Sequence, residues 1–173
     1  TLTYADGSKY TGGWQNGLRL GQGTFIYADG SKYIGGWIKS DFHGHGTLIY
    51  ADGSKYTGGW QNGLRHKYGT LTFPDGRQYT GEWMVSDAAP AAAFYGQGTF
   101  KYTDGSKYIG GWHLGLRHSQ GTLTYADGSK YMGGWKEGLR HGQGTFKYTD
   151  GSKYIGGWLS LIHISEPTRL STI

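Results

Sequence analysis

A tryptophan recurs at a fixed interval along almost the whole chain of 173 residues. Successive tryptophans are 23 residues apart, except that 29 residues separate Trp83 from Trp112. A constant period of roughly 20 to 50 residues is typical of repeat proteins, in which each repeat is one small structural unit. The sequence therefore predicts seven copies of one unit, with an insertion of six residues in the gap after Trp83.

Each unit contains two short runs in which aromatic residues or glycine alternate with other residues. In one unit these runs are residues 24–27 (Thr-Phe-Ile-Tyr) and 33–37 (Tyr-Ile-Gly-Gly-Trp). A period of two and these residue types favour β-strands. Asp29 and Gly30 stand between the runs, where an Asp side chain can cap its own turn and a glycine accepts a positive φ angle. Each unit is therefore expected to be a β-hairpin.

A lone hairpin is only marginally stable in water, whereas stacked hairpins share a buried face. We therefore predict an all-β fold, a single-layer, elongated, twisted antiparallel sheet of stacked β-hairpins over residues 1–158. The alternation places one tyrosine and one tryptophan of every unit on a common aromatic face: Tyr10, Trp14, Tyr33, Trp37, Tyr56, Trp60, Tyr79, Trp83, Tyr108, Trp112, Tyr131, Trp135, Tyr154 and Trp158. A glycine between them, such as Gly35, leaves room for an aromatic ring to lie on the backbone.

Glycine accounts for 34 residues, which would suit collagen or a flexible linker if the rest of the composition agreed. Only three prolines are present and 16% of the residues are aromatic, so both classes are excluded. The chain has no cysteine, which excludes disulfides, thiolate nucleophiles and cysteine-based zinc sites.

The string from Tyr33 to Trp37, followed by a loop and the His-Gly-His-Gly segment 43–46, resembles the MORN (membrane occupation and recognition nexus) repeat. Residues 135–144 (Trp-Lys-Glu-Gly-Leu-Arg-His-Gly-Gln-Gly) match that pattern most fully. The resemblance extends over residues 1–158 and implies a seven-repeat MORN array.

The units depart from the MORN pattern at a few positions. Only Glu82 keeps the glutamate that the family usually has before the tryptophan, and Leu20 stands where histidine is expected. Lys67 and Ser119 replace the first glycine of the Gly-x-Gly segment. We expect the loops that carry these replacements to be less regular than the others.

Two segments lie outside the repeat pattern. The insertion, at about residues 84–95, is expected to be a surface loop, either a protruding contact loop or simply a tolerated addition. Residues 159–173 have no repeat counterpart, and we expect this tail to be artefactual or disordered. Since Thr1 falls in the middle of a unit, the chain is expected to be a fragment of a longer protein.

The sequence offers few residues for catalysis or for binding a cofactor. Seven of the 12 carboxylates belong to Asp-Gly turns, and paired-carboxylate catalysis would need two acids in one pocket. His43 and His45 could supply two metal ligands, but the MORN pattern has a structural histidine there. The Gly-x-Gly segments lack the helix and the lysine of a phosphate-binding loop. We therefore predict no catalytic, metal-binding or cofactor-binding residue.

Basic residues form two regular rows, and the net charge is +5. The first row is Lys9, Lys32, Lys55, Lys107, Lys130 and Lys153, and the second row is Arg19, Arg65, Arg117 and Arg140. These rows could contact anionic phospholipid headgroups. They could also be solvated residues that keep the sheet edges soluble, the interpretation that the modest net charge favours. Both interpretations stay open from the sequence.

Together these features predict a non-catalytic scaffold that binds a protein partner or itself, with acidic phospholipid as a further candidate partner. The alternative is the regulatory segment of an enzyme, because MORN arrays occur beside phosphatidylinositol 4-phosphate 5-kinase-like lipid kinases and histone-lysine methyltransferases. A carbohydrate- or choline-binding repeat fits less well, because its period is nearer to 20 residues. No nucleic acid partner is expected. Without a visible signal peptide or membrane span, the expected location is intracellular, in the cytoplasm or at a membrane surface.

Overall fold

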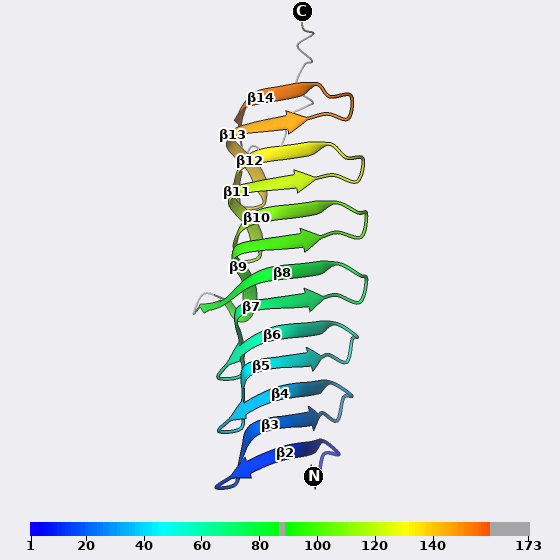
Figure 1. The fold of residues 1–173 in the computed structure, drawn as a ribbon, viewed down its shortest axis with the longest axis vertical. Coiled ribbons are helices and arrows are strands. Elements are labelled where there is room, and N and C mark those ends of the chain that lie inside the picture. Colours follow the sequence, from blue (N-terminus) through cyan, green and yellow to red (C-terminus); the bar gives the residue numbers. More distant parts are fainter. Residues whose placement is uncertain (87–88, 160–173) are drawn as a thin grey trace, which may run out of the picture.

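The computed structural model describes residues 1–86 and 89–159, and in this part of the chain all regular elements are β-strands. Fourteen strands form one open antiparallel sheet, and their order in the sheet is their order in the sequence. Figure 1 shows the sheet as a ladder of strands from the N-terminus to the C-terminus. The predicted fold class, an elongated single-layer sheet of stacked hairpins, is confirmed.

The strands are of similar length, apart from the short first strand and the long ninth. They are β1 (Leu2–Thr3), β2 (Lys9–Gln15), β3 (Leu18–Ile26), β4 (Lys32–Ile38), β5 (Asp41–Ile49), β6 (Lys55–Gln61), β7 (Leu64–Thr72), β8 (Gln78–Ser86), β9 (Ala89–Lys101), β10 (Lys107–His113), β11 (Leu116–Thr124), β12 (Lys130–Lys136), β13 (Leu139–Lys147) and β14 (Lys153–Trp158). Among the described residues, no helix has the length and apolar character needed to cross a membrane.

Five-residue loops containing Asp-Gly connect the strands along one edge of the sheet, which we call the Asp-Gly edge (Figure 1). In the loop between β3 and β4, Asp29 Oδ1 accepts the backbone N–H of Ser31 at 2.8 Å. Gly30 has a φ angle of +88°, which glycine adopts without steric cost. An Asp side chain accepts the equivalent hydrogen bond in all seven loops. These loops are the turns that the Asp-Gly pairs predicted.

Two-residue turns connect most strands along the opposite edge, which we call the tight-turn edge. Asn62 and Gly63 between β6 and β7 both have positive φ angles, 49° and 77°, as in the type I′ turns that suit twisted hairpins. The Gly63 N–H donates to the carbonyl of Phe42 at 3.0 Å, so the turn is held by the preceding unit. Tight turns therefore link successive units as well as successive strands.

The insertion lengthens one hairpin at the tight-turn edge. In β8 and β9, Trp83 pairs with Phe94, Met84 with Ala93 and Ser86 with Ala89. The segment predicted as a loop at about 84–95 thus consists largely of paired strand in its described part. Its use as a contact loop stays a prediction, and residues 160–173 of the predicted tail lie outside the described residues.

Each tyrosine of the aromatic face from Tyr10 to Tyr131 lies over a pair of glycines, and Tyr154 in the last strand lies over Gly156. Tyr33 has no exposed surface, and Gly35 on β4 faces Gly46 on β5. A Cβ atom on Gly46 would lie 2.6 Å from Cζ of Tyr33, and one on Gly35 would lie 2.5 Å from the Cα of Gly46. Side chains at these positions would therefore displace the ring or separate the strands. The glycines do leave room for a ring, and that ring belongs to the tyrosine two residues before the first glycine.

Two kinds of hydrogen bond fix the aromatic rings to the backbone, and the five inner units, those of Trp37 to Trp135, have both. The Tyr33 hydroxyl donates to the Gly36 carbonyl at 3.0 Å, and the Trp60 indole N–H donates to the Gly46 carbonyl at 3.1 Å. The tyrosine bond lies within one strand, whereas the tryptophan bond joins neighbouring strands. The same tyrosine bond recurs at Tyr10, Tyr56, Tyr79, Tyr108, Tyr131 and Tyr154, and the same tryptophan bond at Trp37, Trp83, Trp112 and Trp135.

The strands that follow the tight turns contain a bulge at the first position of the Gly-x-Gly segment. Gly44, Lys67 and Ser119 occupy this position with φ angles of 70°, 57° and 60°. The expectation of less regular backbone at Lys67 and Ser119 is therefore wrong. The register is the reason, because Gly58 pairs with Gly69 while Trp60 pairs with Arg65, which leaves two extra residues on β7. Pairing on both sides of the bulge imposes one conformation on any residue.

Replacing Lys67 or Ser119 by glycine is expected to stabilise the protein by about 0.5 to 1 kcal/mol, since a left-handed conformation costs other residues more than it costs glycine. Chemical denaturation of Lys67→Gly and Ser119→Gly would measure the gain. Lys130→Gly, in an extended strand, is the matched control and is expected to lose stability. A lower free energy of unfolding in all three variants would contradict the prediction that Lys67 and Ser119 are strained at the bulge.

The variant Gly46→Ala is expected to lower the free energy of unfolding by about 1 to 3 kcal/mol, because its Cβ would overlap the ring of Tyr33. Thermal and chemical unfolding would measure the loss. The exposed substitution Lys107→Ala serves as the control and is expected to change the free energy by less than about 0.5 kcal/mol. Equal stability of Gly46→Ala and the wild type would show that the ring does not lie on the glycines.

Candidate functional site

The aromatic face is filled by contacts between neighbouring units. Tyr33 makes edge-on contacts with Trp37 of its own strand and Trp60 of the next unit, at ring-centroid distances of 5.1 and 5.5 Å. It also stacks on Phe42 at 3.7 Å. The rings at the ends of the array are less covered; for example, Trp14 is 42% exposed. Since these rings pack on one another, the interior of the aromatic face offers little surface to a ligand.

The predicted arginine row lies at the junctions between units. Each guanidinium lies over the tryptophan of the following unit, a favourable cation–π arrangement. The distances from Cζ to the ring centroid are 4.4 Å for Arg19 on Trp37, 4.8 Å for Arg65 on Trp83, 4.3 Å for Arg117 on Trp135 and 4.4 Å for Arg140 on Trp158.

Hydrogen bonds hold three of these arginines in place. Arg19 donates to the Ser40 carbonyl at 3.0 Å and Arg117 to the Gly138 carbonyl at 2.7 Å, each in the tight turn of the next unit. Arg65 donates to the Tyr50 hydroxyl. These guanidinium groups are partly buried and contribute to the packing between units.

The sequence contains a signal for this packing role that charge alone does not reveal. Phe42 pairs with Trp37 and Phe94 with Trp83 in the same way that Arg19 pairs with Trp14. Two units therefore have phenylalanine at the repeat position where four have arginine. An exchange between Arg and Phe at one repeat position indicates that the side chain there packs on an aromatic ring, because the guanidinium and the phenyl ring can both stack with a flat surface.

The predicted lysine row follows the Asp-Gly edge and is open to solvent. Five of its six members are exposed, and Lys32 is half-buried. Two further lysines lie directly opposite members of the row, Lys101 opposite Lys107 and Lys147 opposite Lys130. The ion pair of Arg77 with Asp75, 2.7 Å long, also lies at this edge. The lysines are thus the more accessible of the two predicted basic rows.

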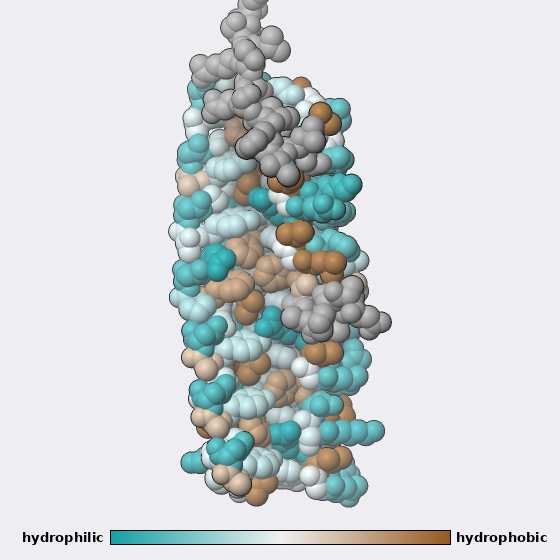
Figure 2. Space-filling view, turned by 180° about the vertical axis from the view of Figure 1, so that it is seen from behind, coloured by the Kyte–Doolittle hydropathy of each residue, from teal (hydrophilic) through white to brown (hydrophobic). Residues whose placement is uncertain are grey.

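The other side of the sheet, which we call the threonine face, carries threonine and aliphatic residues. Thr47 and Thr57 exchange a hydrogen bond of 3.1 Å across β5 and β6. On the same face Ile34, Ile109 and Met132 are 44%, 48% and 45% exposed. The threonine face therefore combines exposed apolar side chains with a polar background. Figure 2 looks onto the opposite side of the sheet, that of the aromatic face, where hydrophobic residues gather between hydrophilic long edges.

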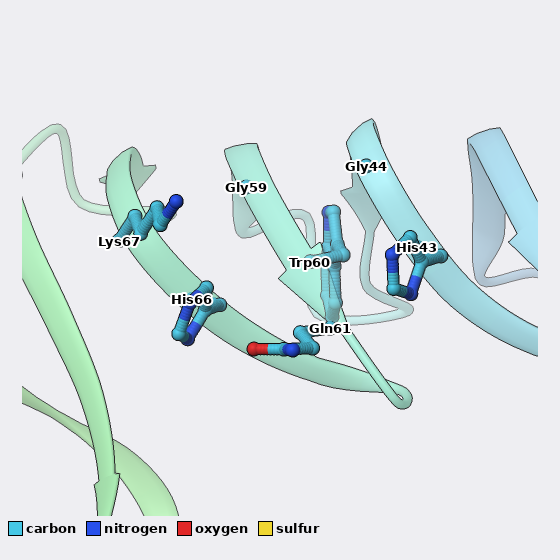
Figure 3. Close-up of a pocket in the computed structure, with 7 residues that line it drawn as sticks. All are labelled: His43, Gly44, Gly59, Trp60, Gln61, His66 and Lys67. Atoms are coloured by element: carbon cyan, nitrogen blue, oxygen red, sulfur yellow. The ribbon is translucent and has the colours of Figure 1, made fainter.

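A hollow of about 240 Å³ lies across β5, β6 and β7. Figure 3 shows the His43 and His66 side chains on either side of β6, with Gln61 between them. Lys67, Trp60 and two glycines, Gly44 and Gly59, complete the lining. His45, the other candidate metal ligand, is not among these residues. In the described residues, no group of three or more His, Asp or Glu side chains lies close enough to hold a metal ion.

Burial and hydrogen bonds shift the pKa values of residues in the repeat motif. Desolvation raises the pKa of the tyrosine hydroxyls above the usual value of 10.0 at Tyr10, Tyr27, Tyr33, Tyr56, Tyr79, Tyr102, Tyr108 and Tyr131. Hydrogen bonds from Ser8 lower the pKa of Asp6, and the same arrangement acts at Asp52 and Asp127. Most of these groups also take part in hydrogen bonds within the repeat unit, so the shifts follow from the packing of the array.

These features define a class of protein, an open single-layer repeat sheet with one face packed on itself and one face exposed. Six segments of the chain match the family model of the MORN repeat, residues 10–32, 33–55, 56–76, 96–107, 108–130 and 131–153. Since the segments cover more than half of the chain, it belongs to the MORN repeat family. The matches begin at the motif tyrosines, except for the segment that follows the insertion.

Solved structures show a similar fold at low sequence identity. The TCP domain of SAS-4 (dCPAP) from Drosophila melanogaster, in complex with a proline-rich motif of Ana2 (dSTIL), has 19% identity and a TM-score of 0.50 over 89% of this chain and 86% of that chain. The TCP10 domain of CPAP from Danio rerio has 11% identity and a TM-score of 0.51 over 90% and 72%. No curated protein sequence matches the chain.

Replacing Arg65 by alanine is expected to lower the free energy of unfolding by about 1 to 2 kcal/mol, because the stacking on Trp83 is lost. Arg65→Phe is expected to recover most of that loss, since phenylalanine occupies the same place in two other units. Urea denaturation of both variants would test this. Equal losses for Ala and Phe would show that the position does not depend on a flat side chain.

Stability is expected to fall as the pH rises above 10. Burial raises the pKa of the motif tyrosines in the folded chain above the value of 10.0, which the unfolded chain is expected to keep. Folding therefore gains its full contribution from these groups below pH 10 and loses it between that pH and the raised pKa. Tyrosinate absorbance and circular dichroism followed together should change in one cooperative step. Free titration of all tyrosines near pH 10 without unfolding would contradict their burial.

Proposed function

We propose that this MORN array is a non-catalytic scaffold that binds a protein partner, or a second copy of itself, through its threonine face. The observation that carries the proposal is a set of exposed aliphatic side chains at one repeat position, Ile34 on β4, Ile109 on β10 and Met132 on β12, spaced along one face of a continuous sheet. Exposed apolar groups framed by polar residues are typical of interaction sites. The aromatic face is occupied by its own contacts, which leaves the threonine face as the broad accessible surface.

The fold likeness supports a partner that is an extended segment of protein. The SAS-4 TCP domain, a sheet of similar fold, was solved with a proline-rich motif of Ana2. An open sheet offers a long surface with regularly spaced side chains, which suits an extended chain. We extend that mode of binding, but not the identity of the partner, to the threonine face of this protein.

The double variant Ile34→Asp, Ile109→Asp is expected to abolish partner binding while leaving the melting temperature nearly unchanged, because both side chains are exposed. Affinity capture from the source cells, quantified by mass spectrometry, and sedimentation velocity would detect a partner protein and self-association respectively. The control is Lys9→Gln, Lys153→Gln on the lysine row. Capture and self-association that are identical for the wild type and the double variant would contradict the proposal.

Acidic phospholipid is a second candidate partner, favoured by the exposed lysines of the Asp-Gly edge. A basic residue near an anionic membrane contributes about 1 kcal/mol of attraction, which salt weakens. Replacing Lys55, Lys107 and Lys130 by glutamine should then reduce co-sedimentation with phosphatidylserine vesicles more than Arg65→Phe does. Vesicle binding that changes neither with the salt concentration nor with the replacement of these lysines would exclude this candidate.

A further inference from the structure

The hollow on the threonine face exists because a residue without a side chain lies between two histidines. Gly59 on β6 is flanked by His43 from β5 and by His66 and Lys67 from β7, and Gln61 closes one side (Figure 3). Imidazole, ammonium and amide groups all carry N–H donors. No Asp or Glu side chain is among the lining residues. The hollow therefore offers several hydrogen-bond donors and one positive charge to an acceptor that enters it.

Another unit shows what can occupy this place. Glu82 stands at the repeat position of Gly59, immediately before the tryptophan. Its carboxylate lies against Gly96, the bulge residue of the next strand, where an added Cβ would come within 2.7 Å of the Glu82 carboxyl carbon. Lys67 is the bulge residue that corresponds to Gly96 in the Gly59 unit. At Gly59 this carboxylate is missing, and a lysine lies beside the space.

We propose that this hollow binds the carboxylate of an Asp or Glu side chain that an extended acidic segment of a partner protein presents to the threonine face. The inference rests on the proposed function and specifies the chemistry of the partner. Charge complementarity supports it, because the chain has a net charge of +5 and only 12 acidic residues. Asp41, the acid of the neighbouring β5, lies toward the tight turn at Gly63 and does not line the hollow.

The surroundings of the hollow suit a peptide chain. Ile38 on β4, the strand beside the hollow, and Leu64 on β7, one of the strands that form it, are 44% and 42% exposed. Both residues lie on the threonine face. A bound peptide in extended conformation would direct every second side chain toward this face. An acidic residue with apolar residues two positions before and after it would match this arrangement. A flat membrane surface cannot enter a recess walled by two imidazole rings as a single side chain can.

The test uses the ¹⁵N-labelled full chain and two short peptides with blocked termini. In the first peptide, Thr and Val alternate around one central Glu, and in the second that Glu is Gln. Nuclear magnetic resonance titration would follow the backbone amides of Gly59 and Lys67. The Glu peptide is expected to bind about tenfold more tightly than the Gln peptide, as a charge-assisted hydrogen bond allows.

The variant Lys67→Gly separates binding from folding, because it is expected to stabilise the chain while it removes the positive charge from the hollow. It should lose most of the tenfold preference for the Glu peptide. Ser119→Gly makes the same backbone change outside the hollow and should keep that preference. Phosphatidylserine vesicles serve as a parallel probe and should bind equally to both variants.

Three results would overturn the inference. Equal affinity for the Glu and Gln peptides, with shifts at Ile34 or Ile109, would show that the threonine face binds peptides but that the hollow does not select a carboxylate. Absence of binding by either peptide would reject the acidic segment as a partner, while the variants at Ile34 and Ile109 still test the proposed function separately. Vesicle binding that Lys67→Gly abolishes and Ser119→Gly keeps would assign the hollow to a lipid headgroup.

Discussion

The structure depends on a tyrosine ring that lies flat on its own backbone. A single-layer sheet has no second layer to cover its apolar side chains, so the chain must bury them against itself. Tyr33 does this by lying over Gly35 and Gly46 and donating its hydroxyl proton to the Gly36 carbonyl. The ring is thereby removed from water without an unsatisfied polar group. The abundance of glycine follows from this arrangement, because most other residues at these positions would displace the ring.

The contacts between units explain why the array behaves as a series of coupled neighbours. From Trp37 to Trp135 each tryptophan donates to a carbonyl of the preceding strand, and an arginine or phenylalanine of the preceding unit packs on its ring. A hairpin has few of these contacts on its own, so stability grows with the number of neighbours. The proposed function depends on the same contacts. Because the aromatic face is largely buried between neighbouring units, a partner can bind to the threonine face and to the edges.

Much of the fold could be predicted because every unit repeats the same local signals. The alternation around Tyr33 and the turn at Asp29-Gly30 specified the hairpin, and the constant period specified the stacking. The packing of Arg65 on Trp83 was missed because charge was considered without the phenylalanines that share its repeat position. The regular bulge at Lys67 was missed because pairing on both sides overrides the preference of the residue. The hollow at Gly59 could not be predicted, since its walls come from three strands whose side chains meet only in the folded sheet.

The extended hairpin of β8 and β9 implies a rule for how this array tolerates added sequence. The insertion adds six residues to the unit, and Phe94 still pairs with Trp83 while Phe100 is still buried. Neighbouring side chains of a strand point to opposite faces, so the paired strands lengthen by one residue each, and any odd residue must be taken up by the turn or by a bulge. The register shift between Met84 and Ser86 shows such an irregularity within the lengthened hairpin. The tight-turn edge can therefore accept added sequence while the aromatic face keeps its register.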